Sequence, residues 1–134
     1  MKIIEQEEVR KLLQPKDCIQ LMAEALKGLE SGEYAQPARL ITVMPNTAKF
    51  GFMPAYVGDY FGAKVISAFA PNMGTKYPSH IGYVMLFESA HSTVAGMIEA
   101  GSITEIRTGA VSAAATDLLA RKDSHKLALI GAGA

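Results

Sequence analysis

Residues 101–134 read GSITEIRTGAVSAAATDLLARKDSHKLALIGAGA, and this stretch decides the fold that we expect for the chain. Ser102 is followed three residues later by Glu105, a capping-box pattern that predicts the start of a helix. Small and apolar residues then recur at helical spacing as far as Leu118. The small side chains in the middle of this helix should let another backbone approach it closely.

The end of the same stretch is a short apolar run, residues 126–130, followed directly by Gly131-Ala132-Gly133-Ala134. A buried strand that runs into a Gly-x-Gly turn is how a dinucleotide-binding βαβ unit begins. The third glycine and the helix that would receive the pyrophosphate are not in the sequence, so the pattern predicts the first strand of an incomplete Rossmann domain. The alternative is a glycine-rich tail after an ordinary edge strand.

The composition is that of a globular domain, with 134 residues, 49% hydrophobic residues and a formal net charge of zero. This neutral balance argues against a nucleic-acid surface, which needs a basic patch. No apolar run approaches the ~18 residues of a membrane span, so we expect no membrane partner. The single cysteine, Cys18, cannot form a disulfide within the chain and favours a reducing, cytoplasmic location.

The remaining sequence predicts an α+β fold. A short strand (2–4) and a helix pair (5–13 and 15–31, the second ended by Gly32) come first. Five short segments rich in β-branched and aromatic residues then predict a largely antiparallel sheet, of five to six strands in all: 40–44, 50–53, 63–69, 82–87 and 93–98. The capped helix and the first Rossmann strand follow the sheet.

Three basic residues stand out because charges are scarce around the predicted strands: Arg39, Lys64 and Arg107. A charge within an apolar run must be paired, reach water or be kept for a ligand. Together these groups could bind a small carboxylate, since the arginine fork suits bidentate contact. The alternative for each residue is a solvated charge or a structural ion pair.

Other candidate residues carry weaker signals. Met53, between Phe52 and Pro54, could line a pocket or simply fill the core. His80 could be catalytic, although a hydrogen-bonded loop histidine is the more common role. No set of His, Cys, Asp and Glu has the spacing of metal ligands, so we expect no metal.

Taken together, the segments resemble the ornithine cyclodeaminase/mu-crystallin family over essentially the whole chain. The matching motifs occur in the family's order: Gln36-Pro37-Ala38-Arg39, Phe52-Met53-Pro54-Ala55-Tyr56, Gly62-Ala63-Lys64-Val65, Pro71-Asn72, Pro78-Ser79-His80, Leu86-Phe87-Glu88, residues 103–110 (ITEIRTGA) and residues 130–134 (IGAGA). The chain is similar to the N-terminal part of such a protein, with most of the Rossmann domain missing.

This resemblance implies roles for particular residues. Lys64 is the expected catalytic residue, facing the reacting carbon and nitrogen, and Arg39, Met53, Lys64 and Arg107 are the expected substrate-binding residues. The expected contacts with the cofactor, NAD or NADP, are Ser79, Arg107, Thr108, Gly131, Gly133 and Ala134. The two arginines and burial should depress the pKa of Lys64, so that it could accept a proton near neutral pH.

The implied activity is NAD(P)-dependent oxidation or reduction of an amino or imino acid, as in alanine dehydrogenases and ketimine reductases, or the related loss of ammonia by cyclodeaminases. Residues 1–124 would be the substrate-binding and dimerisation domain, and residues 125–134 the start of the dinucleotide-binding domain. The family implies a homodimer, and we expect this chain alone to be inactive and to bind NAD(H) weakly. The alternatives are a non-catalytic small-molecule binder or a dimerisation module only.

Overall fold

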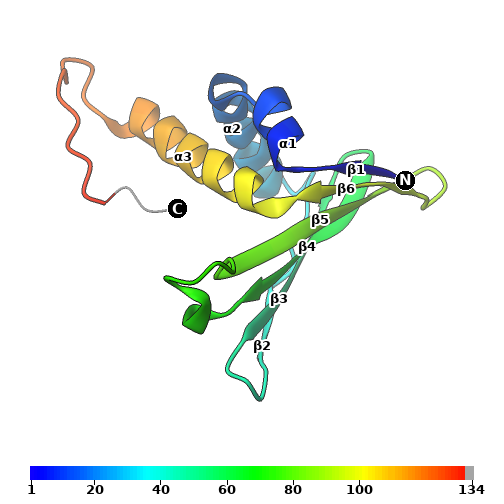
Figure 1. Ribbon diagram of the computed structural model, residues 1–134. Helices are drawn as coiled ribbons and strands as arrows, with labels where there is room; N and C mark the ends of the chain where they lie inside the picture. The colour runs from blue at the N-terminus through cyan, green and yellow to red at the C-terminus, as the bar shows by residue number, and fades with distance from the viewer. Residues whose placement is uncertain (132–134) are drawn as a thin grey trace.

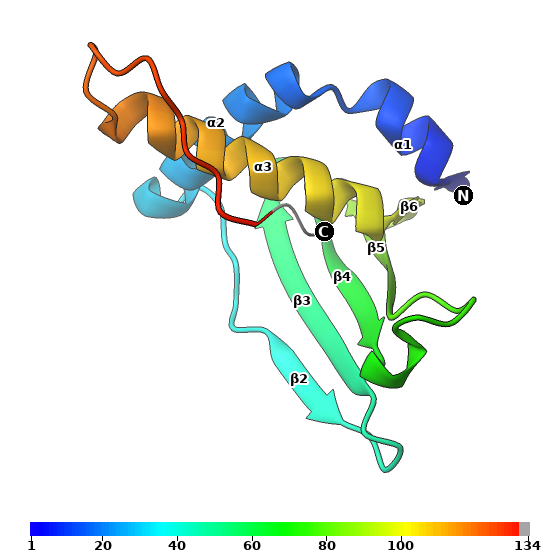
Figure 2. The same ribbon diagram turned by 60° about the vertical axis from the view of Figure 1, so that its left-hand side comes forward.

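The computed structural model describes residues 1–131. Within these residues, three α-helices accompany a six-stranded sheet. The helices gather on one side of the sheet, and strands β2 and β3 extend away from them (Figures 1 and 2). The elements follow in the order β1 (Lys2–Ile4), α1 (Gln6–Leu12), α2 (Pro15–Ser31), β2 (Leu40–Val43), β3 (Lys49–Val57), β4 (Tyr60–Ala68), a 3-10 turn (Ala70–Asn72), β5 (His80–Glu88), β6 (Val94–Glu99) and α3 (Ala100–Leu119). The mixed α+β fold predicted from the sequence is confirmed.

The sheet has the strand order β1-β6-β5-β4-β3-β2, in which β2 to β6 form an antiparallel meander and β1 pairs with β6 in parallel. Strands β3, β4 and β5 are longer than the sequence predicted, because pairing on both sides carries each strand past the residues that suggested its end. One such residue is Pro54, which lies within β3 opposite Ala63. Another is Gly62 of β4, which lies opposite Leu86 of β5.

Helix α2 packs against α3 and has the predicted bounds. Pro15 occupies its first turn, and Gly32 ends it in the left-handed conformation with φ of 79°. The buried core contains mainly small side chains, including Cys18 of α2 and Ala110 and Ala114 of α3. The predicted close approach to the small-sided helix is therefore confirmed.

The predicted start of α3 is wrong. The helix begins at Ala100, and its N-cap is Glu99, whose carboxylate accepts hydrogen bonds from the backbone N–H groups of Gly101 and Ser102. Strand β6 runs into α3 without a loop, so the last strand residue satisfies the free amide groups of the first turn. Ser102 instead lies inside the helix, and its hydroxyl is buried without a hydrogen-bond partner in the described chain.

The predicted strand over residues 126–130 is not formed. These residues have no regular secondary structure, and Leu127, Leu129 and Ile130 are 81%, 77% and 99% exposed. A strand needs a neighbour to satisfy its backbone groups, and residues 1–131 offer this segment none. Gly133 and Ala134 lie outside the described residues, and the proposed domain boundary at residue 124 remains a prediction.

The helices of the described part are too short or too polar to cross a membrane.

Candidate functional site

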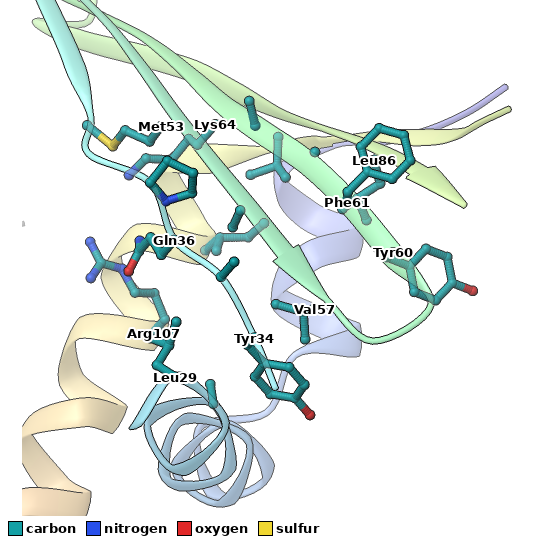
Figure 3. Close-up of a pocket in the computed structure, with 18 of the residues that line it drawn as sticks. Leu29, Tyr34, Gln36, Met53, Val57, Tyr60, Phe61, Lys64, Leu86 and Arg107 are labelled. Atoms are coloured by element: carbon teal, nitrogen blue, oxygen red, sulfur yellow. The ribbon is translucent and has the colours of Figure 1, made fainter. Parts of the chain in front are cut away.

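A cavity of about 800 Å³ lies between the helices and the sheet (Figure 3). Helices α2 and α3 form one wall, strands β3, β4 and β5 form the other, and residues 34–39 close one side. Most of the lining is apolar and includes Leu26, Leu29, Val57, Phe61, Val84, Leu86, Ile103 and Val111. Met53 and Lys64 lie at one end of the cavity, whereas Tyr34 and Tyr60 lie at the other.

All four predicted substrate-binding residues line this cavity, and they come from four different parts of the chain. Lys64 of β4 is paired with Met53 of β3 on one side and Val84 of β5 on the other. This row faces the cavity, because alternate strand residues share one face of a sheet. Arg107 reaches the cavity from α3, and Arg39 from the segment that leads into β2.

The cavity carries an uncompensated positive charge. None of its lining residues is acidic, and within residues 1–131 no carboxylate forms an ion pair with Arg39, Lys64 or Arg107. Burial lowers the pKa of Lys64, and repulsion from Arg107 and then Arg39 lowers it further. The three residues are therefore arranged to receive an anion.

Sequence reasoning missed two polar residues of the site, Gln36 and Thr104, which also line the cavity. Lys64 Nζ donates a hydrogen bond to Thr104 Oγ1 at 3.2 Å, and Thr104 Oγ1 donates one to the carbonyl oxygen of Ala100 at 2.6 Å. Both residues belong to motifs that the sequence analysis used, QPAR and ITEIRTGA. Nothing in the sequence showed that Thr104 meets a lysine 40 residues away.

Of the other predicted cofactor contacts, the three that the structure describes, Ser79, Thr108 and Gly131, do not line the cavity. Ser79 precedes β5, and its Oγ lies 3.1 Å from Nδ1 of His80. Thr108 is exposed on α3, one turn beyond Thr104, whose carbonyl oxygen accepts a 2.6 Å hydrogen bond from the Thr108 hydroxyl. Gly131 has φ of 88°, a left-handed conformation that suits a glycine turn.

No three His, Cys, Asp or Glu side chains of the described chain come together as a metal site. The expected absence of a metal remains a prediction.

Residues 1–134 match the family model described as "Ornithine cyclodeaminase/mu-crystallin family". The ketimine reductase mu-crystallin of Mus musculus is 34% identical over 115 residues, which are 84% of this chain and 36% of that protein.

Solved structures of other proteins share the fold. An archaeal alanine dehydrogenase dimer with bound NAD gives a TM-score of 0.86 at 25% identity, over 91% of this chain and 38% of that one. The Δ1-pyrroline-2-carboxylate reductase of Thermococcus litoralis, in complex with NADH and L-proline, gives a TM-score of 0.85 at 30% identity, over 92% and 39%. The chain thus spans less than half the length of these relatives.

Proposed function

The chain belongs to the ornithine cyclodeaminase/mu-crystallin family, and from this premise we propose that it is the substrate-binding part of an NAD(P)-dependent oxidoreductase for amino or imino acids. The observation that carries the proposal is the convergence of Arg39, Lys64 and Arg107 on one largely apolar cavity that has no acidic lining residue. The similarity to a ketimine reductase and to a reductase solved with NADH and L-proline supports it.

The two arginines would bind the substrate carboxylate. A guanidinium offers a planar pair of donors that matches a carboxylate, and Arg107 reaches the cavity from the helical wall while Arg39 reaches it from the segment that closes one side. Met53 and the apolar walls would contact the hydrocarbon part of the substrate. This division of polar and apolar groups fixes which end of the substrate lies beside Lys64.

Lys64 would act on the substrate nitrogen. Its lowered pKa lets the neutral amine exist closer to neutral pH, where it can take a proton from the ammonium group of an amino acid. The step leaves a neutral substrate amine and a lysine ammonium, and only the neutral amine readily loses hydride from the adjacent carbon. Bound NAD(P) would supply the hydride acceptor, or the hydride donor in the reverse direction.

The residues of this chain fit part of a dinucleotide site. The left-handed Gly131 suits the first position of a glycine turn, and we propose that Gly133 and Ala134 continue it. Ser79, Arg107 and Thr108 would approach the nicotinamide end. Because no helix for the pyrophosphate follows within residues 1–131, we expect weak NAD(H) binding and no turnover from this chain alone.

We propose that residues 1–124 also form the dimer interface. Phe50 and Phe52 of β3 and Ile81 of β5 fall on the sheet face opposite the Met53–Lys64 row, and they are 43%, 42% and 55% exposed. Contiguous exposed apolar residues of this kind commonly mark an interface. The cytoplasmic location inferred from the single cysteine also remains a prediction.

A second candidate function is small-molecule binding without turnover. It is favoured by one observation, which is that the described residues that line the cavity all lie between Met22 and Val111, and Gly131 is not among them. Calorimetric titration of residues 1–134 with L-proline, with and without NADH, separates the two functions. A non-catalytic binding protein would be favoured by two results together. Residues 1–134 would bind L-proline as tightly as the longer protein does, and NADH would not change the affinity of the longer protein for L-proline.

The catalytic proposal is tested with Lys64→Met in the protein that includes the complete dinucleotide-binding domain. Loss of a positioned proton-transfer group should lower kcat by roughly 10²–10⁴-fold. Lys49→Met is the matched control, because Lys49 is an exposed lysine of the same sheet and does not line the cavity. A Lys64→Met protein with a native circular dichroism spectrum and near-normal kcat would contradict the proposal.

A further inference from the structure

We propose that Thr104 is a positioning residue that holds the Lys64 side chain by accepting an N–H hydrogen bond, and so leaves the lysine lone pair free for the substrate. The inference rests on the proposed function for the role of Lys64. The hydrogen bonds that carry it are properties of the chain itself.

The direction of the contact follows from the single proton of the threonine hydroxyl. Thr104 Oγ1 donates that proton to the carbonyl oxygen of Ala100, one helical turn earlier, at 2.6 Å. The oxygen therefore has only lone pairs to offer to Lys64 Nζ, 3.2 Å away. Lys64 must be the donor in this contact whether it is an ammonium or a neutral amine.

This direction matters most when Lys64 is neutral. A neutral amine has two N–H groups and one lone pair, and the lone pair is the part that accepts a proton. A hydroxyl with an uncommitted proton could donate to that lone pair and occupy it. Because the Thr104 hydroxyl already donates its proton to the carbonyl oxygen of Ala100, it accepts a hydrogen bond from an N–H group of Lys64. The lone pair of Lys64 Nζ then remains available in the cavity.

Three other hydroxyl side chains of α3 make the same local hydrogen bond as Thr104 and can be compared with it. Thr108, Ser112 and Thr116 each donate to the carbonyl oxygen four residues earlier, at 2.6, 3.2 and 2.8 Å. Among the described residues, Thr104 is the member of this series that also bonds a lysine. Such bonds slightly disfavour a helix, so helix stability does not explain the position of Thr104.

The charged groups around Lys64 come from two elements, Arg107 from α3 and Arg39 from the segment before β2. The other titratable side chains that line the cavity are Tyr34 and Tyr60. An acceptor at Thr104 favours the ammonium form of Lys64, because hydrogen bonds to charged groups are stronger than those to neutral groups. Removing the acceptor should therefore move the pKa of Lys64 further down.

The test is an NMR titration of Lys64 in the chain of residues 1–134 labelled on lysine Cε and Nζ, with the signal assigned from Lys64→Met. Thr104→Val, which keeps the side-chain shape, should shift the titration of Lys64 to lower pH, and Thr104→Ser should restore it. Thr116→Val is the matched control and should leave the titration unchanged. Thr104→Ala provides a second variant if Thr104→Val does not fold.

An unchanged midpoint of the Lys64 titration in a folded Thr104→Val or Thr104→Ala chain would overturn the inference. A midpoint at higher pH would also overturn it, because it would indicate that the Thr104 hydroxyl donates its proton to Lys64. The titration involves no turnover, so failure of the proposed function does not decide its outcome. In the longer protein, loss of the same contact should lower kcat by about 10–100-fold with little change in KM, since misplacement of a reacting group has effects of this size.

Discussion

Gly62→Ala tests the packing that places Lys64, because Gly62 lies two residues before Lys64 on the same strand and the same face. A Cβ atom at Gly62 would lie 2.1 Å from the carbonyl oxygen of Met85, on the neighbouring strand β5. Ordinary van der Waals contact begins at 3.4 Å, so β4 and β5 would have to separate by roughly 1 Å here. Strand β4 is also paired with β3, so it cannot move without straining that side.

We expect Gly62→Ala to lower the free energy of unfolding by about 1–3 kcal/mol, the usual cost of inserting a methyl group into a packed site. For a chain of this size the urea midpoint should fall by roughly 1 M. The matched control is Gly109→Ala, which adds the same methyl group to an exposed helical position where, apart from its chain neighbours and the backbone of its own helix, no atom lies within 4 Å of the added Cβ. This variant should gain about 0.5–1 kcal/mol from helix propensity.

The assay is urea unfolding followed by circular dichroism, with all variants at one protein concentration because association would contribute to stability. A Gly62→Ala chain as stable as the parent would show that the strands accommodate a side chain at this point. That result would refute the argument that a glycine is required beside Lys64. If Gly109→Ala also lowered the free energy of unfolding, the loss in Gly62→Ala could not be assigned to the contact with the Met85 carbonyl oxygen.

Three further predictions concern the cavity and the sheet. In the longer protein, Arg39→Lys should mainly raise KM, because a point charge replaces a planar fork in ground and transition states alike; an unchanged KM in steady-state kinetics would contradict this. The folded state binds the Lys64 proton more weakly than the unfolded state does. The free energy of unfolding should therefore rise as pH increases from the lowered pKa of folded Lys64 towards 10.5, and urea titrations of Lys64→Met should show a smaller rise. Light scattering should show a dimer or larger assembly, whereas a clean 14.3 kDa monomer at high concentration would count against the proposed interface.

Local signals were sufficient for most of the fold. Proline at the first turn and glycine after the last fixed both ends of α2, and the turn residues separated the strands of the meander in their correct order. The start of α3 could not be read locally, because it depends on β6 continuing directly into the helix so that Glu99 becomes the cap. The segment 126–130 has an apolar pattern that predicts a strand, but a strand also depends on partners that its own pattern does not supply.

The site was predictable where a residue conflicted with its local pattern. Lys64 was visible as a charge in an apolar strand. Arg39 and Arg107 were visible because charged residues are scarce around the predicted strands, and the structure brings all three residues to one cavity. Thr104 was not visible, because a threonine in a helix is ordinary until its partner across the fold is known. The apolar walls could not be assigned either, since leucine and tyrosine in α2 and the β3–β4 hairpin fit a closed core equally well.

The choice of two arginines and one lysine also has a chemical logic. Arginine stays protonated at any physiological pH, so Arg39 and Arg107 can depress the pKa of Lys64 and still bind a carboxylate. A bound carboxylate offsets part of their charge and should raise the affinity of Lys64 for a proton while the substrate is present. Lys64 would thus release its proton more easily in the empty cavity and accept one more readily beside the substrate, and Thr104 would keep its lone pair unoccupied in between. An acidic residue in the cavity would neutralise the arginines permanently and remove this dependence on substrate, which gives a physical reason for a lining without one.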